Sequence, residues 1–343
     1  DSLEEQVGIW QRELAAEVLE SVYNGERIDL IGNCSRRGTG FKPGCKCKVP
    51  AGSGLTELAL EIDRPELYQA YLGSSLTEFS QKYAGKCIGI CSSIILEHGV
   101  PDRLYIGNQF CHLLFPERKL LFEIIEKAVA EQVKITLVFS YIREYMLDYI
   151  TELLDEINQW CEEKRQTVEV VVNDWGMASL VKKYRKNLIP SLGILLNKRK
   201  KDPRISFKKG EQKWFERNSL NAGFYRNFLE REYGIQRFEW ESCGYEQQIP
   251  PGKNSLHIPF YQTNTSQYCP LGAVCETGER GRQKFAKKCP GYCAEYAFLY
   301  PEHLHMIGRY NSLFGIDMRI LKEEEILEKY IQNGVDRVVI RTW

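Results

Sequence analysis

The sequence predicts an α/β fold, a (β/α)₈-like barrel of the TIM type. From residue 57 onward, short apolar runs rich in β-branched residues alternate with stretches of helical periodicity. Strands that alternate with helices of about 11 to 20 residues are typical of βα units and a parallel sheet. About eight such units fit into the roughly 285 residues available, which favours a closed barrel over an open sheet. No glycine-rich dinucleotide or P-loop motif follows a predicted strand, so nucleotide chemistry of those kinds is not indicated.

The same alternation sets the order of the elements. Strands or short apolar β-type runs are expected at 58–62, 87–92, 103–108, 134–140, 169–174, 190–197, 237–241, 256–263, 318–321 and 337–341. Helices are expected at 66–83, 117–132, 143–164, 177–187, 213–233 and 323–333. The helix at 117–132 is a clear case, because Leu121, Ile124, Ile125 and Ala128 recur at helical spacing on one face.

The first 56 residues form a separate N-terminal extension before the barrel of 57–343. Residues 3–23 have the periodicity of an amphipathic helix, and 33–54 are rich in Gly, Lys and Cys. Cys34, Cys45 and Cys47 suggest a second metal site or an anion-binding loop, whereas a basic loop without a ligand is the alternative.

Composition sets further bounds. The 343 residues contain 46 Lys and Arg against 46 Asp and Glu, so no overall charge indicates a nucleic acid or an anionic membrane as partner. No apolar run reaches the ~18 residues of a membrane span and no signal peptide is seen, so we expect a cytoplasmic protein. Twelve cysteines in such a chain favour metal binding over disulfides.

The cysteines gather near the C-terminal end. Cys269, Cys275, Cys289 and Cys293 share a segment dense in Gly, Pro and Lys, and Cys111 follows the predicted strand 103–108. The C-terminal ends of all barrel strands surround the same opening, so Cys111 could complete a set of four thiolates with three from this segment. Four thiolates suit zinc or a 4Fe–4S cluster. The absence of paired Cys-x-x-Cys knuckles favours the cluster, with zinc as the alternative.

Other candidates also lie at strand ends. Asp174 beside Trp175 could act in proton transfer, or it could cap the helix that follows. Asn197 and Arg199 open a basic run that could bind a substrate, or that is simply a solvated loop.

The strand 237–241 adds a further candidate. Glu239 and Glu241 flank Trp240 in it, and we expect one side of the strand to face inward, with one carboxylate paired to Arg237. Glu241 is therefore a candidate for binding substrate.

Four stretches occur in an order that resembles a known family: Leu104–Cys111, Val172–Gly176, Leu192–Lys198 and Cys289-x-x-x-Cys293. The chain from about 57 to 341 is similar to the collagenase-like "peptidase" U-family, which includes the ubiquinone-biosynthesis proteins UbiU and UbiV. The resemblance implies a barrel that holds a 4Fe–4S cluster through Cys111, Cys289, Cys293 and a fourth thiol. Cys269 is the favoured fourth ligand and Cys275 the alternative.

The resemblance also implies a function. We expect a protein that performs or supports an oxygen-independent modification, most simply a hydroxylation, of an aromatic, nucleotide or peptide substrate such as a small molecule, tRNA or a peptide. The alternatives are a non-catalytic iron–sulfur subunit, paired in a heterodimer with a related protein, and a true peptidase. No nucleophile motif or catalytic zinc motif supports the peptidase.

Overall fold

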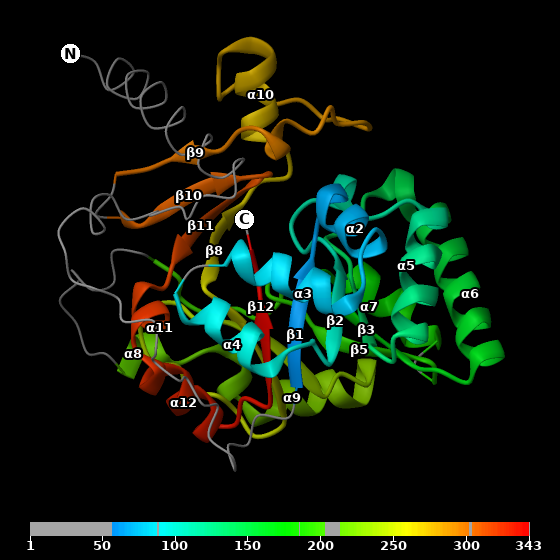
Figure 1. Ribbon diagram of the computed structural model, residues 1–343, viewed down its shortest axis with the longest axis horizontal. Helices are drawn as coiled ribbons and strands as arrows, with labels where there is room; N and C mark the ends of the chain where they lie inside the picture. Colours follow the sequence, from blue (N-terminus) through cyan, green and yellow to red (C-terminus); the bar gives the residue numbers. More distant parts are fainter. Residues whose placement is uncertain (1–56, 88, 185, 203–212, 302–303, 343) are drawn as a thin grey trace.

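The computed structural model describes residues 57–342 apart from 88, 185, 203–212 and 302–303, and it confirms the predicted barrel (Figure 1). Eight parallel strands close in the order β1-β12-β7-β6-β5-β4-β3-β2. They are β1 (Glu57–Ile62), β2 (Arg103–Gly107), β3 (Lys134–Val138), β4 (Val168–Val172), β5 (Leu188–Leu192), β6 (Arg237–Glu241), β7 (Lys253–Ile258) and β12 (Arg337–Ile340). The predicted N-terminal helix and the loop with Cys34, Cys45 and Cys47 lie outside the described residues.

Helices surround the barrel (Figure 1). The described ones are α2 (Pro65–Leu72), α3 (Leu76–Gly85), α4 (Ile90–His98), α5 (Arg118–Ala130), α6 (Leu147–Lys164), α7 (Trp175–Val181), α8 (Lys213–Glu216), α9 (Gly223–Phe228), α10 (Pro270–Thr277), α11 (Met318–Lys322) and α12 (Glu324–Gln332). Helix α6 buries Ile150, Leu153, Leu154 and Ile157 on one face, which is why its sequence is periodic.

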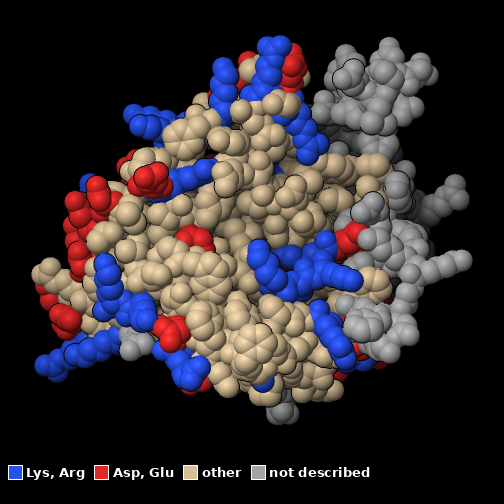
Figure 2. All heavy atoms as spheres, turned by 180° about the vertical axis from the view of Figure 1, so that it is seen from behind, with Lys and Arg blue, Asp and Glu red and all other residues tan. Residues whose placement is uncertain are grey.

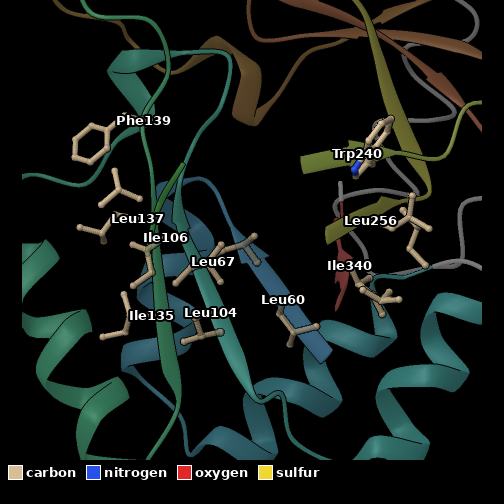
Figure 3. Packing of buried hydrophobic residues seen from close by; sticks show 14 of the residues in the cluster. Leu60, Leu67, Leu104, Ile106, Ile135, Leu137, Phe139, Trp240, Leu256 and Ile340 are labelled. Carbon is tan, nitrogen blue, oxygen red and sulfur yellow. The ribbon is translucent and has the colours of Figure 1, made fainter. Parts of the chain in front are cut away.

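The main apolar core lies between the strands and these helices. Leu60, Leu104, Ile106 and Ile135 all point outward from the barrel into this layer, as Figure 3 shows for neighbouring strands. Every second residue of these strands therefore serves the outer core, and the residues between them face the barrel interior.

A second sheet was not predicted. Its strands are β8 (Phe260–Thr265), β9 (Phe298–Leu299), β10 (Met306–Arg309) and β11 (Ser312–Ile316), in the antiparallel order β8-β11-β10-β9. It extends from the C-terminal end of the barrel, with α10 beyond it (Figure 1). The expected single strand 256–263 is thus two strands, and the chain passes from one sheet to the other at Pro259.

Two other expectations were wrong. The runs 87–92 and 318–321 belong largely to helices α4 and α11 rather than to strands. In α4, Ile90, Cys91, Ile94 and Ile95 are buried at helical spacing, so a short apolar run was misassigned to a strand. Within the described part of the chain, none of the helices combines the length and apolar character required to cross a bilayer.

Candidate functional site

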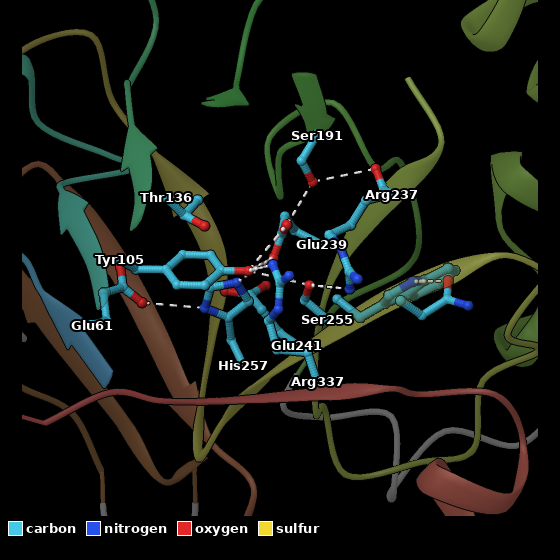
Figure 4. Close-up of polar contacts among 12 residues, drawn as sticks. Glu61, Tyr105, Thr136, Ser191, Arg237, Glu239, Glu241, Ser255, His257 and Arg337 are labelled. Carbon is cyan, nitrogen blue, oxygen red and sulfur yellow. Dashed lines mark hydrogen bonds and ion pairs between the residues drawn. The ribbon is translucent and has the colours of Figure 1, made fainter. Parts of the chain in front are cut away.

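The interior of the barrel is rich in charged residues. They occupy alternate positions of β6 and some of the inward-facing positions of β1 and β12, and Figure 4 shows side chains from these strands meeting inside the barrel. The interior set comprises Glu57, Glu61, Arg103, Glu169, Arg237, Glu239, Glu241, His257, Arg337 and Arg341. Sequence reasoning named only Glu241 among them as a site residue. The signal that sequence reasoning missed is the presence of charged residues in strands that a barrel buries on both faces.

His257 lies at the centre of this set. Its Nδ1 is 3.2 Å from Glu61 Oε2 and its Nε2 is 2.9 Å from Glu239 Oε2, and all three side chains are essentially unexposed. Because an ionised carboxylate only accepts hydrogen bonds, contacts on both ring nitrogens require the imidazolium. Burial lowers the pKa of His257, but its bonds to Glu239 and Glu61 outweigh burial and raise it.

Both carboxylates have further partners. Glu61 accepts from Arg341 Nε at 2.9 Å, and the attraction of Arg341 and His257 outweighs burial, bringing the pKa of Glu61 down to about 2. Glu239 accepts from Ser191 Oγ at 2.5 Å and from Tyr105 Oη at 3.2 Å. The expected pairing with Arg237 is wrong, because Arg237 turns toward the N-terminal end of the barrel and pairs with Asp336 at 2.9 Å.

Three of the predicted substrate-binding residues lie close together. Glu241 is 2.9 Å from Lys201 Nζ, 3.4 Å from Arg199 Nη2 and 3.6 Å from Arg341 Nη1. Asn197 donates to the Glu239 carbonyl at 2.9 Å, and its Oδ1 has no hydrogen-bond partner in the part of the chain that the structure describes. Burial lowers the pKa of Lys201 to about 8 against the attraction of Glu241.

Asp174 lies elsewhere and has a local task. It is the N-cap of α7, where its Oδ1 accepts from the Met177 amide at 2.8 Å. Its Oδ2 accepts from the Ile142 amide at 2.6 Å, which ties the end of β4 to the loop after β3. Both carboxylate oxygens are thus engaged by the backbone, as the capping alternative predicts.

Three thiols of the cysteine segment affect the pKa of Cys111. This pKa is raised to about 12, mainly by burial and partly by the charges of Cys293, Cys269 and Cys289. These influences connect a thiol after β2 to three thiols far along the chain. Cys269, and not Cys275, is one of the three thiols that affect Cys111. Cys275 lies exposed on α10, and Cys269 and Cys289 affect its pKa.

Backbone amides point at two of these sulfurs. The Gly272 amide is 3.3 Å from Cys269 Sγ, and the Gly291 amide is 3.3 Å from Cys289 Sγ. Such N–H···S contacts stabilise thiolates. Among the described residues, no three His, Cys, Asp or Glu side chains are grouped tightly enough to hold a single metal ion.

The turn between β10 and β11 joins the cysteine segment to the barrel. Cys269 Sγ donates to the Tyr310 carbonyl at 3.3 Å, and Arg309 Nε donates to the Cys293 carbonyl at 3.1 Å. Asn311 Nδ2 donates to the carbonyl of Phe110, the residue before Cys111, at 2.9 Å. This turn was missed because it contacts residues distant in sequence.

A cleft of about 190 Å³ lies beside Cys111. Its walls come from the loop after β2, the end of β3 and the start of α6, and they include His112, Phe115, Phe139, Tyr141 and Tyr149. Five of its twelve lining residues carry an aromatic ring, and Phe115 stacks on Phe139 with ring centroids 4.4 Å apart. The cleft therefore suits a flat, mainly apolar group.

No protein-family model, curated protein or solved structure matches this chain. The contacts above are therefore the basis for a functional proposal.

Proposed function

We propose that this chain is an iron–sulfur barrel protein that performs or supports an oxygen-independent modification, in the simplest case a hydroxylation. In this proposal Cys111, Cys269, Cys289 and Cys293 hold a 4Fe–4S cluster at the C-terminal end of the barrel. The observation that carries the proposal is the turn between β10 and β11. Arg309 and Tyr310 bond to Cys293 and Cys269, and Asn311 bonds to the residue before Cys111.

The donor set fits such a cluster. Four cysteine thiolates are the usual ligands of a 4Fe–4S cluster, and N–H···S contacts such as those of Gly272 and Gly291 tune its potential. A cluster stands between its ligands and keeps them farther apart than a single ion does.

The neighbouring residues have defined tasks in this proposal. When bound, the cluster supplies electrons, or a Lewis-acidic iron if one ligand is lacking. Phe115, Phe139 and Tyr141 bind and orient a flat substrate in the cleft and exclude water from it. Arg143 lies 4.9 Å from the centroid of the Tyr141 ring, where it can attract a negatively charged group of the substrate.

A second candidate is a non-catalytic subunit that acts with a related protein. Exposed aromatic side chains surround Arg143, with Tyr268 41% exposed and Phe285 44% exposed. Lys and Arg side chains also gather on the part of the molecule that projects beyond the barrel (Figure 2). Aromatic residues with arginine are typical of protein interfaces. An iron-loaded protein that stays inactive until a second protein is added would favour this role.

The decisive experiment measures iron and sulfide in protein purified without oxygen. The wild type is expected to be brown and to contain about four irons per chain. Cys→Ser changes at 111, 269, 289 and 293 are expected to lower the iron content, whereas Cys275→Ser, the matched control on the same segment, retains it. Full iron in Cys111→Ser would refute the barrel-mouth site, and one zinc without iron would refute the cluster.

A further inference from the structure

The N-terminal end of the barrel opens onto a cavity of about 610 Å³. Residues from all eight barrel strands line it, so it is coaxial with the barrel and lies at the end opposite the cysteines. It shares no lining residue with the cleft beside Cys111. Its volume is in the range of pockets that hold small molecules.

Three arginines form the floor of this cavity. Arg103, Arg237 and Arg337 line it, and their side chains are 8%, 9% and 1% exposed. Their positive charge is matched by the carboxylates of Glu57, Glu169 and Asp336.

Each of these carboxylates already has strong partners. Glu57 Oε2 is 2.5 Å from Arg337 Nη2, Glu169 Oε2 is 2.6 Å from Arg337 Nη1, and Asp336 pairs with Arg237. Burial would raise the pKa of Glu169, but its bond to Arg337 and the charges of three arginines lower it to about 2. The carboxylates are thus fully occupied, and the floor itself is balanced in charge.

Two lysines add an excess of positive charge at the rim. Lys134 pairs in register with Arg103 on β2 and β3, and Lys253 pairs in register with Arg237 on β6 and β7. Like charges at neighbouring register positions repel each other, and Lys134 Nζ offsets part of this repulsion by pairing with Glu57 Oε1 at 2.6 Å. In the barrel order the two pairs lie on opposite sides of the opening, so they face a common space.

Unused hydrogen-bond donors at the cavity also favour an anionic ligand. Among the described residues, Arg237 Nε finds no hydrogen-bond partner, and a carboxylate oxygen of Glu169 lies 3.8 Å from it. Gln166 and Thr167 add exposed neutral donors at the rim.

We propose that this cavity binds a phosphate group, either inorganic phosphate or the head group of a small phosphate monoester. The excess of two positive charges among its described lining residues matches a phosphate monoester, which carries about 1.5 to 2 negative charges at neutral pH. Arginine and lysine together are the side chains that bind phosphate oxygens most strongly. A bound phosphate would relieve the repulsion within both register pairs and stabilise the closed barrel.

Calorimetric titration of the full chain tests this site, with inorganic phosphate and glycerol phosphate as probes at constant ionic strength. The wild type is expected to show saturable binding at millimolar concentrations or below. Lys253→Gln is expected to weaken binding about tenfold, the effect of losing one charge-assisted contact. The control is Lys119→Gln on α5, because Lys119 is 92% exposed and lies outside the cavity.

The outcomes separate the alternatives. Binding of both probes assigns a monoester head group, and binding of inorganic phosphate alone assigns the free ion. Absence of saturable heat with either probe, or equal weakening by Lys253→Gln and Lys119→Gln, would overturn the proposal. Iron content plays no part in this test, so its result is independent of the cysteine site.

Discussion

The barrel interior and the cysteine segment organise reactive side chains in opposite ways. Inside the barrel, Glu61, Glu239 and His257 are unexposed, and the chain itself supplies a partner for each. In the segment, Cys275 and Cys289 are exposed, and the described regular structure between 269 and 293 consists of α10 and the start of one short 3₁₀ turn. The Glu61–His257–Glu239 network is therefore satisfied by side chains of the barrel, whereas the hydrogen-bond partners described for Cys269 and Cys289 are backbone groups.

The largest effect is expected from opening the interior network. Glu239→Leu leaves the His257 imidazolium with one carboxylate and removes the acceptor of Ser191 and Tyr105. We expect the free energy of unfolding in urea to fall by about 3–5 kcal/mol. Glu152→Leu, at a 68% exposed position, is the control and should change it by less than about 0.5 kcal/mol. A loss below about 1 kcal/mol for Glu239→Leu would show that the barrel does not depend on this network.

The pH dependence of stability should report the same network. Because the folded state raises the pKa of His257 above 6.5, its contribution is fully present below pH 6.5 and is lost as the pH rises through the folded value. Glu61, lowered from 4.5 to about 2, contributes above pH 4.5 and loses this as the pH falls toward 2. The difference in unfolding free energy between wild type and His257→Gln should therefore be greatest between pH 4.5 and 6.5. His98→Gln is the surface control, and a difference that grows above pH 7 would contradict this assignment.

The sequence predicted the barrel because about eight short apolar runs alternate with helical stretches. It did not predict the second sheet, because β9 has two residues and β10 has four, too few to show a period. Arg199 and Glu241, both named as substrate-binding candidates, do pair, and their binding of substrate stays a prediction. His257 was missed because its partners lie on β1 and β6, and only closure of the barrel brings them together.

Substitutions of Asp174 test whether this strand-end residue serves local structure rather than chemistry. Asp174→Ala removes the acceptor for the Met177 and Ile142 amides, so we expect a loss of about 1 kcal/mol in unfolding free energy. Asp174→Asn keeps an oxygen for the Met177 amide but places its NH2 group against the Ile142 amide, so it should lose the second bond alone, about half as much. Equal losses in the two variants would show that the bond to Ile142, rather than the cap, is what matters.

The smallest effect on the barrel is expected at the turn that joins the two regions. Asn311→Ala removes the hydrogen bonds to the carbonyls of Phe110 and Ser266, at 2.9 and 2.7 Å. Global stability should fall by only about 1 kcal/mol, because the barrel strands keep all their contacts. Trypsin should nevertheless cleave faster at the exposed basic residues of the segment, which are Arg280, Arg282, Lys284, Lys287 and Lys288.

Asn264→Ala on β8 is the matched control, since Asn264 is exposed on the same sheet. It should leave the cleavage rate of the segment unchanged. If Asn311→Ala also left that rate unchanged, the segment would be held by contacts other than this turn. If instead Asn311→Ala unfolded the barrel at the same urea concentration at which the segment is released, the two regions would form one cooperative unit, and the contrast between them would not hold.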